Sequence, residues 1–437
     1  MASPLRILFV APYVPSRIRV RPYQIIRHLV QAGHEVTLVA LADALPDADQ
    51  AIAEMQDVCG GPERVHVVPH DRLLARAQCA LALPTPTPLW AAYCRSSAMA
   101  DLLARLTRKE NFDVAHVEHL RAAHFASALA PSLPRVMDAV DCITALRRQM
   151  LDQARASNTG LASRLLAWEE WTKLRRYEPR AYSRFGQVVV TSPHDAGELA
   201  HLVTSGDAPL PPVHVIPNGV DLDYFSAYAS DEDDAAEPDT LVFSGKMSYH
   251  ANDDAARFLL TEVMPRLRRL RPRARLTIVG SQPTPGLRTL VEQTNASEYT
   301  TVTGYVDDLR PFLRRAQVAV CPMRVGVGIQ NKALEAMAVS RPVVCSPLVR
   351  RGLCADGLDG ALRVAETADQ FAQGIAGLLA RPAEARAAGA VARRYVEAHH
   401  RWSRAAQALV NVYGAARDLA ARGAAMRASE PVGKETR

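Results

Sequence analysis

Residues 317–346 read QVAVCPMRVGVGIQNKALEAMAVSRPVVCS, and their pattern indicates the fold class. Its two ends, 317–322 and 342–346, are continuous apolar runs of strand length. Between them, a loop with two glycines leads into an apolar helix expected to begin near Asn331. Apolar strands separated by helices are typical of a parallel sheet that is covered on both faces.

The same alternation fills most of the chain on either side. The expected strands of the first half are 5–11, 34–41, 64–69, 113–118, 135–140, 186–192 and 213–217, and those of the second half are 240–245, 275–280, 301–306, 317–322, 342–346 and 361–365. A linker separates the halves, because IPNGVD (216–221) is followed by the acidic run 231–239. We expect an α/β protein of two doubly wound domains, 1–222 and 223–398. A helix over 399–426 is expected to cross back to the first domain, and the tail 427–437 is expected to be disordered.

Composition narrows the classes of function. A chain of 437 residues is too long for one core. Its net charge of +6 comes without a long basic run, which argues against a nucleic-acid partner. The seven cysteines include no Cys-x-x-Cys pair, which argues against a metal cluster and favours a reducing compartment. No apolar run reaches the length of a membrane span. We expect a cytoplasmic protein and leave peripheral contact with the inner face of a membrane open.

The glycine-containing loop is the strongest candidate site. Gly326 and Gly328 allow the backbone to approach a ligand closely, and the following helix directs free N–H groups into the loop. This environment suits a diphosphate, to which Lys332 can add a charge. Glu335 lies on nearly the same helix face, where its carboxylate can accept hydrogen bonds from a vicinal diol such as ribose. The alternative is a surface ion pair between Lys332 and Glu335.

Two further strand ends belong to the same edge of the second sheet, because ligands of doubly wound sheets bind at the carboxyl ends of the strands. Gly245 ends one expected strand and Lys246 follows it, and Gly304, Tyr305 and Val306 come after the TVT (301–303) that begins another. No Asp-x-Asp motif stands at a strand end, so we expect no metal. No Gly-x-Gly-x-x-Gly follows the first strand, which disfavours a dinucleotide oxidoreductase.

Five blocks in fixed order carry a resemblance to a known family. They are IPNGVD (216–221), FSGKMSYHAND (243–253), RLTIVG (275–280), TGYVDDLRPFLRRAQVAVCP (303–322) and GVGIQNKALEAMA (326–338) with RPVV (341–344). Together they resemble the donor half of retaining glycosyltransferases of family 4. The opening stretch 17–39 and GIQNKALEAMA resemble a subgroup associated with exopolysaccharide and exosortase systems. The resemblance implies the GT-B fold, in which two Rossmann-like domains face each other across a cleft.

The resemblance implies a role for several positions. Lys246, beside Gly245, and Lys332 match basic positions against the donor diphosphate, and Glu335 matches the second glutamate of the Glu-x7-Glu element, which holds the ribose. Tyr305 and Val306 match the segment whose backbone contacts the base. Gly328, Ile329, Gln330 and Asn331 match the loop around the phosphates and the transferred sugar. His119 resembles a histidine near the donor sugar, with a structural histidine as the alternative, and joins Lys246 and Glu335 as a catalytic candidate.

The first domain is expected to bind the acceptor. Arg17, Arg19 and Arg21 alternate after the first strand, so an extended loop would place all three on one side. That face would suit an anionic acceptor such as a polyprenyl-diphosphate-linked glycan, and a solvated basic loop is the alternative. Asp141 is a further candidate at a strand end.

One position departs from the family pattern, because Val327 stands where the first glutamate of Glu-x7-Glu belongs. The expected function is a metal-independent glycosyltransferase that moves a sugar from a nucleoside diphosphate sugar to a glycan, with retention and without a cofactor. Two other interpretations stay open. They are an inactive assembly subunit of a polysaccharide machine, which Val327 favours, and a nucleotide-sugar epimerase.

Overall fold

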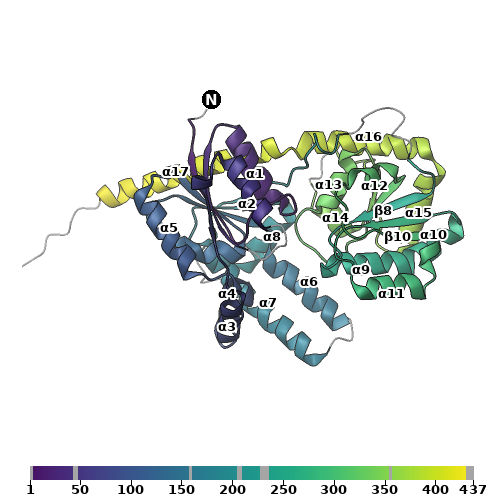
Figure 1. The fold of residues 1–437 in the computed structure, drawn as a ribbon, viewed down its shortest axis with the longest axis horizontal. Helices are drawn as coiled ribbons and strands as arrows, with labels where there is room; N and C mark the ends of the chain where they lie inside the picture. Colours follow the sequence, from purple (N-terminus) through teal and green to yellow (C-terminus); the bar gives the residue numbers. More distant parts are fainter. Residues whose placement is uncertain are drawn as a thin grey trace, which may run out of the picture. The chain divides into compact units, whose positions relative to one another are not determined.

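The computed structural model describes residues 3–42, 48–156, 160–203, 209–226, 236–353 and 357–429. The chain divides into two compact units (Figure 1). Unit 1 consists of Met1–Ile216 and Trp402–Arg437, and unit 2 consists of Pro217–Arg401. The first unit is therefore built from two separate segments of the sequence.

Unit 1 contains a parallel sheet. Within its described residues the sheet has seven strands in the order β3-β2-β1-β4-β5-β6-β7. The strands are β1 (Arg6–Ala11), β2 (Glu35–Leu41), β3 (Val65–Val68), β4 (Val114–Glu118), β5 (Arg135–Val140), β6 (Gln187–Val190) and β7 (Val213–Val215). The helices are α1 (Val20–Gln31), α2 (Ala48–Cys59), η1 (Pro62–Arg64), α3 (Arg72–Ala82), α4 (Leu89–Tyr93), α5 (Ser97–Lys109), η2 (Leu120–Ala128), α6 (Ile143–Ala156), α7 (Leu161–Tyr182), α8 (Pro193–Leu202) and α17 (Trp402–Ser429).

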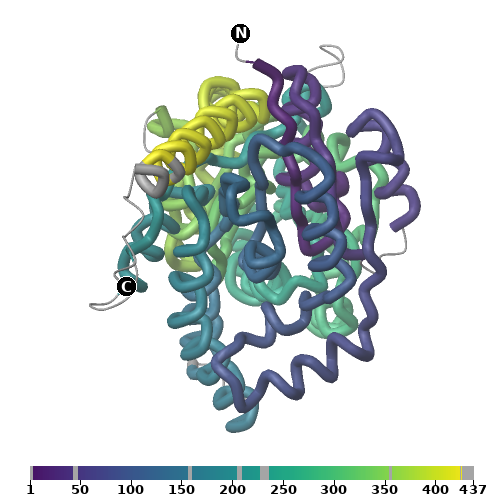
Figure 2. Tube along the Cα trace, turned by 90° about the vertical axis from the view of Figure 1, so that its left-hand side faces the viewer, coloured from purple at the N-terminus to yellow at the C-terminus, as the bar shows by residue number. Residues whose placement is uncertain are grey.

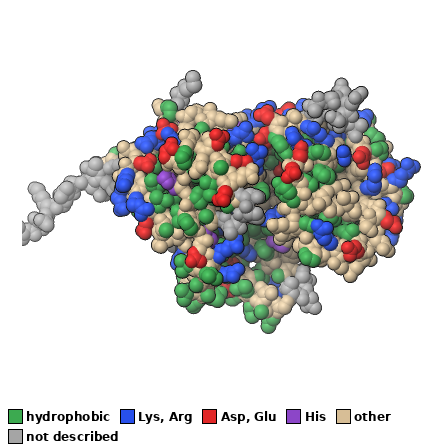
Figure 3. Space-filling model, in the orientation of Figure 1, with side chains coloured by type: hydrophobic (Ala, Val, Ile, Leu, Met, Phe, Trp, Pro, Cys, Tyr) green, Lys and Arg blue, Asp and Glu red, His purple; other side chains and the backbone are tan. Residues whose placement is uncertain are grey.

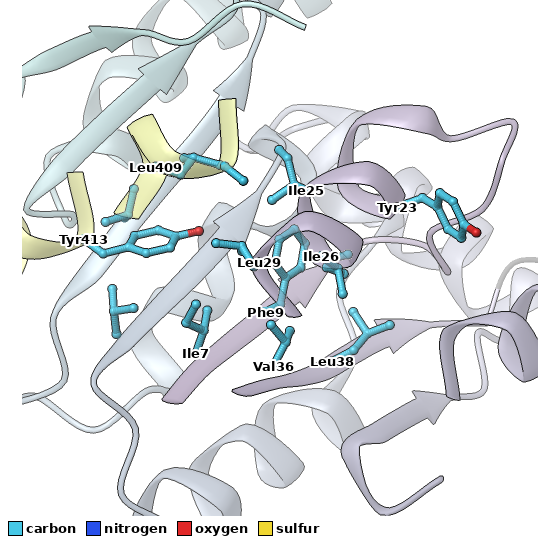
Figure 4. Close-up of a cluster of buried hydrophobic side chains, with 14 of the residues drawn as sticks. Ile7, Phe9, Tyr23, Ile25, Ile26, Leu29, Val36, Leu38, Leu409 and Tyr413 are labelled. Atoms are coloured by element: carbon cyan, nitrogen blue, oxygen red, sulfur yellow. The ribbon is translucent and has the colours of Figure 1, made fainter. Parts of the chain in front are cut away.

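The core of unit 1 joins the two ends of the sequence. Phe9 of β1, Ile25 of α1 and Tyr413 of α17 are buried in one apolar cluster (Figure 4). The Tyr413 hydroxyl lies 2.9 Å from Nδ1 of His116, which is itself fully buried in β4. The yellow α17 and the purple α1 therefore share one unit, as the tube in Figure 2 also shows. Helix α17 comes from the second segment of unit 1, whereas the sheet comes from the first. Burial of apolar surface against α17 therefore stabilises the sheet.

Unit 2 repeats the architecture. Its sheet has six parallel strands among the described residues, in the order β10-β9-β8-β11-β12-β13. The strands are β8 (Thr240–Ser244), β9 (Arg275–Val279), β10 (Thr300–Val302), β11 (Val318–Cys321), β12 (Val343–Cys345) and β13 (Leu362–Val364). The helices are α9 (His250–Phe258), η3 (Leu259–Val263), α10 (Met264–Leu270), α11 (Pro285–Gln293), η4 (Ala296–Glu298), α12 (Arg310–Arg315), α13 (Asn331–Ala338), α14 (Pro347–Arg351), α15 (Ala368–Ala380) and α16 (Pro382–His399).

The predicted fold class is confirmed. Two parallel sheets with surrounding helices form, and each predicted apolar run contains a strand except 301–306, which β10 (Thr300–Val302) overlaps only at the first two residues of the run. The acidic run falls partly in 227–235, outside the described residues, as does the end of the tail from 430. No described helix has the length and apolar character that crossing a bilayer requires.

Candidate functional site

The candidate site of unit 2 lies where its parallel strands end. Because β8, β9, β10 and β11 are neighbours in the sheet, the loops that follow them meet at one edge. The Gly245 amide donates to the Val279 carbonyl at 2.9 Å, and the Gly280 amide donates to the Gly304 carbonyl at 3.2 Å. These bonds fix the loops after β8, β9 and β10 against one another.

Two glycines make this close approach possible. Gly245 has φ 153° and Gly280 has φ 146°, a region that residues with a Cβ rarely adopt. A Cβ at Gly280 would lie 1.9 Å from the Gly245 carbonyl oxygen, and a Cβ at Gly245 would lie 2.7 Å from Nδ2 of Asn252. The backbone before Lys246 can therefore take this position only because Gly245 and Gly280 carry no side chains.

Gly280→Ala should destabilise unit 2. The new methyl group would meet a backbone oxygen rather than a flexible side chain, so the loop after β8 must move. Overpacking and backbone strain together should cost about 2–4 kcal/mol of unfolding free energy in urea titrations. Gly374→Ala is the matched control in α15, where the Cβ meets only Val344 at an ordinary 3.7 Å. Equal stabilities for the two variants would contradict the close packing of the loops.

The loop between β11 and α13 forms the floor of the site. Gly326 and Gly328 have φ 155° and φ 64°. The Ser346 hydroxyl donates to the Met323 carbonyl at 2.6 Å and so ties the loop to the end of β12. Gln330 caps α13 without a side-chain capping bond, so the first N–H groups of the helix have no side-chain acceptor from it. Its side chain instead donates to the Val327 carbonyl at 3.4 Å.

Asn331 and Ile329 complete this loop. Asn218 donates from Nδ2 to Oδ1 of Asn331 at 3.1 Å, and the Asn218 carbonyl accepts from His400 at 2.7 Å. Ile329 is buried, with 8% of its surface exposed. The start of α13 is therefore held by the IPNGVD segment, and Asn218 is a site residue that the sequence did not single out.

Lys332 bonds to Asn252 and not to its helix neighbour Glu335. Its Nζ donates to Oδ1 of Asn252 at 2.8 Å and lies 3.7 Å from the sulfur of Met323. Asn252 in turn donates to the Lys246 carbonyl at 2.9 Å, so one amide links the lysine to the loop after β8. Burial lowers the pKa of Lys332, opposed by the nearby Cys321 and Glu335. Asn252 belongs to the FSGKMSYHAND block, but the sequence gives it no role of its own.

Glu335 has the properties expected of a ligand-binding carboxylate. It is half-buried, and its carboxylate forms no hydrogen bond or ion pair with any residue that the structure describes. Burial raises its pKa to about 7, and Lys332 lowers it in part. The alternative of a surface ion pair with Lys332 is wrong, because the ammonium is bonded to Asn252 instead. A half-buried carboxylate without donors is costly unless a ligand supplies them.

The remaining donor candidates lie at the same strand ends. Lys246 is exposed and makes no ion pair within the described part of the chain. Tyr305 is 70% exposed, and Val306 is half-buried in the loop after β10. Their contacts with a ligand stay predictions. No group of three His, Cys, Asp or Glu side chains suited to a metal is found among the described residues.

The prediction of three aligned arginines in unit 1 is wrong. Helix α1 begins at Val20, so Arg21 belongs to a helix and not to an extended loop. Arg21 is 5% exposed and donates to both carboxylate oxygens of Asp138, at 2.9 and 3.2 Å, and to the Ile216 carbonyl at 3.1 Å. The guanidinium is thereby saturated with protein acceptors. Arg19 packs over the Tyr13 ring at 4.2 Å, and Arg17 is exposed.

His119 is half-buried at the end of β4 with a positive φ of 65°. Its Nδ1 accepts the Arg121 amide at 3.2 Å, so the neutral ring carries its proton on Nε2. Burial lowers the pKa of His119 to about 3, reinforced by Arg121. The ring is therefore a neutral hydrogen-bond donor. At Asp141, burial and then the neighbouring Asp195 raise the pKa to about 7, and Thr191 donates to it at 3.1 Å.

Both halves of the chain match family models. Residues 19–224 match the model described as Glycosyltransferase Family 4, and residues 238–381 match the model described as Glycosyl transferases group 1. The chain belongs to the GT-B glycosyltransferases. This glycosyltransferase has no match among curated protein sequences. The exosortase-associated subgroup stays a prediction.

Solved structures share the fold of this glycosyltransferase at low identity. Sucrose-phosphate synthase from Thermosynechococcus elongatus matches with a TM-score of 0.67 and 18% identity, over 96% of this chain and 100% of that one. HepE from Anabaena in complex with UDP matches with a TM-score of 0.66 and 13% identity, over 94% and 100%. The α,α-trehalose 6-phosphate synthase from Burkholderia multivorans matches with 0.60 and 14%, over 96% and 100%.

Proposed function

We propose that this glycosyltransferase moves a sugar from a nucleoside diphosphate sugar to a glycan acceptor in exopolysaccharide synthesis, with retention of configuration and without a metal. The observation that carries the proposal is Glu335, a half-buried carboxylate in the second turn of α13 to which no side chain or amide of the described residues donates. HepE, which has the same fold, was solved with UDP, with UDP and glucose, and with UDP-glucose. We take a nucleotide sugar of this class as the donor.

Each charged group then has a defined task. Glu335 accepts hydrogen bonds from the ribose hydroxyls, and the N–H groups of α13 face the diphosphate. Lys332 and Lys246 stabilise the negative charge that gathers on the leaving diphosphate in the transition state. Because these groups are already in place, little reorganisation is needed at the moment of transfer. His119, as a neutral donor through Nε2, offers a hydrogen bond to a hydroxyl of the transferred sugar.

Val327 departs from the family pattern in the loop before α13. A half-buried valine stands where the family pattern has a carboxylate, and Gln330 reaches back to its carbonyl. We propose that Gln330 or Asn331 takes over the contact with the sugar. Turnover that is unchanged in both Gln330→Ala and Asn331→Ala would contradict this substitution. An inactive assembly subunit is the second candidate, favoured by Val327 alone.

Donor affinity should depend on pH through Glu335. The ionised carboxylate accepts both ribose hydrogen bonds, and ionisation requires a pH above its pKa of about 7. Affinity should therefore rise from pH 6 to pH 8, by up to about tenfold per unit below pH 7. Calorimetric titration with the accepted nucleotide sugar measures this rise. In Glu335→Gln the affinity should be low and flat over the same range, and a rise that persists in this variant would point to another group.

A panel of nucleotide sugars tests the proposed function. Release of nucleoside diphosphate is followed with and without lipid-linked glycan acceptors, and the configuration of the product is read by NMR. Release that requires an acceptor supports the transferase. Conversion of the donor without any acceptor would establish an epimerase, and tight binding without turnover across the panel would favour the assembly subunit.

A further inference from the structure

Unit 1 contains a cavity that none of the roles above uses. It has a volume of about 540 Å³ and is lined by α3, α4, α6, α7 and the segment that follows β4. Its apolar wall includes Leu89, Trp90, Tyr93 and Leu166, and Arg121 and Arg147 supply its positive charge. A mixed apolar and cationic lining of this size suits one molecule with an anionic group and a hydrocarbon part.

Trp90 organises the cationic end of the cavity. The guanidinium carbons of Arg121 and Arg147 lie 4.4 and 4.3 Å from the centre of its ring, so they are at most about 8.7 Å apart. Arg121 forms no ion pair with any carboxylate in the described part of the chain. Two cations on one ring, separated by about one screening length of physiological salt (~8 Å) or less, repel each other. A phosphate between them would relieve that repulsion.

Among the described residues of the cavity wall, the one carboxylate already has hydrogen-bond donors. Glu170 is 5% exposed and accepts the backbone N–H groups of Leu89 at 3.0 Å and of Trp90 at 3.4 Å. It therefore caps the start of α4 and fixes Trp90 against α7. Lys173, one turn later, donates to the carbonyls of Ala82 and Leu83 at 3.0 and 2.8 Å. The walls are thus held in place by bonds between α3, α4 and α7.

An apolar surface extends from the cavity. Nine of the sixteen large apolar side chains that are exposed among the described residues belong to the segments of α3, α4 and α7, namely Leu73, Leu74, Leu81, Leu83, Tyr93, Leu161, Leu165, Leu166 and Trp168. In Figure 3, green side chains gather at the lower edge of this unit, where Figure 1 places α3 and α4. No Asp or Glu occurs from Arg72 to Ala100. This concentration is typical of a binding surface.

We propose that the cavity binds an amphiphile with a phosphate or diphosphate group and a long hydrocarbon chain. The phosphate lies between Arg121 and Arg147, and the chain passes Leu166 onto the exposed leucines of α7. His119 stacks on Trp90 with ring centres 5.9 Å apart, which places the anionic end of the amphiphile beside the candidate histidine. The amphiphile is the lipid carrier of the acceptor, and in that respect the inference rests on the proposed function.

Calorimetry with farnesyl diphosphate below its micelle concentration tests the site. Inorganic diphosphate and farnesol serve as probes for the two ends of the ligand. Farnesyl diphosphate should bind at least about 100-fold more tightly than inorganic diphosphate, because the hydrocarbon chain is buried as well. Equal affinities for these two probes would overturn the proposal.

Matched variants locate the ligand. Arg147→Gln should weaken the affinity by about tenfold, as expected for the loss of one charge-assisted bond. Its neighbour Arg148 is exposed and pairs with Glu198 at 2.9 Å, so Arg148→Gln should leave the affinity unchanged. Leu166→Glu should weaken binding, whereas Leu419→Glu on α17, equally exposed, should not. Equal affinities for farnesyl diphosphate within either pair of variants would overturn the proposed site.

Two further readouts separate the alternatives. Glu335→Ala should retain farnesyl diphosphate binding although donor turnover is lost, so the two proposals can fail independently. Loss of farnesyl diphosphate binding in Glu335→Ala would place the ligand in the donor site and overturn the inference. Sedimentation of Leu166→Glu is the last test. A dimer that dissociates in this variant while ligand affinity is kept would identify the apolar surface as a contact between two copies instead.

Discussion

Glu335→Ala should lower kcat/KM for sugar transfer at least about 100-fold. The carboxylate accepts no hydrogen bond from the residues that the structure describes, so the ribose hydroxyls would supply two hydrogen bonds to it. Hydrogen bonds to a charged group contribute about 1.5–3 kcal/mol each, and losing both corresponds to a factor of this size or more. Steady-state kinetics with the donor identified from the panel measures the change.

The fold should survive this substitution, because no described residue bonds to the removed carboxylate. Glu292→Ala is the control, since Glu292 is exposed on α11 in the same unit. It should leave both kinetics and stability near those of the unchanged protein. An unimpaired kcat/KM in Glu335→Ala would refute the ribose role, whatever the structure of the variant.

Arg21→Met should destabilise unit 1 by about 3–5 kcal/mol, as expected when one partner of a buried ion pair is removed. Asp138 is fully buried, and without Arg21 its charge would lie in the core beside His116, whose Nε2 is 3.8 Å away. The Ile216 carbonyl would lose its donor as well. Urea unfolding followed by circular dichroism measures the loss.

Two comparisons identify the cause of this loss of stability. Arg17→Met should change the unfolding free energy by less than about 0.5 kcal/mol, because Arg17 is largely exposed. Adding Asp138→Asn to Arg21→Met should recover part of the loss, since it removes the uncompensated charge. Wild-type stability together with a raised acceptor KM in Arg21→Met would restore the acceptor role that the structure contradicts.

Strands could be predicted because each is a continuous apolar run, and a parallel sheet requires that pattern. The glycine loop before α13 could also be found, because glycine spacing before an apolar helix is a local signal. Arg21 could not be placed in this way. Alternation in the sequence predicts one face only in an extended segment, and the helix start at Val20 carries no capping residue that would reveal it.

The hydrogen-bond partners of the site residues could not be predicted from the sequence either. Asn252 and Asn218 are ordinary amides in the sequence, and their importance lies in reaching Lys332 and Asn331 across long separations in the chain. The cavity beside Trp90 depends on Glu170, which lies far along the chain from the helix that it caps. Contacts of this kind follow from tertiary packing rather than from local pattern.

The return of α17 to unit 1 has a consequence for synthesis on the ribosome. The sheet of this unit is translated early, yet Tyr413 and Leu409 of its core come last. Until these residues emerge, the apolar side chains of β1 and α1 that α17 later covers stay exposed to water and to chaperones. Unit 2, in contrast, is one uninterrupted segment and can fold as soon as it leaves the exit tunnel. Synthesis of unit 1 therefore starts before that of unit 2 and is completed after it.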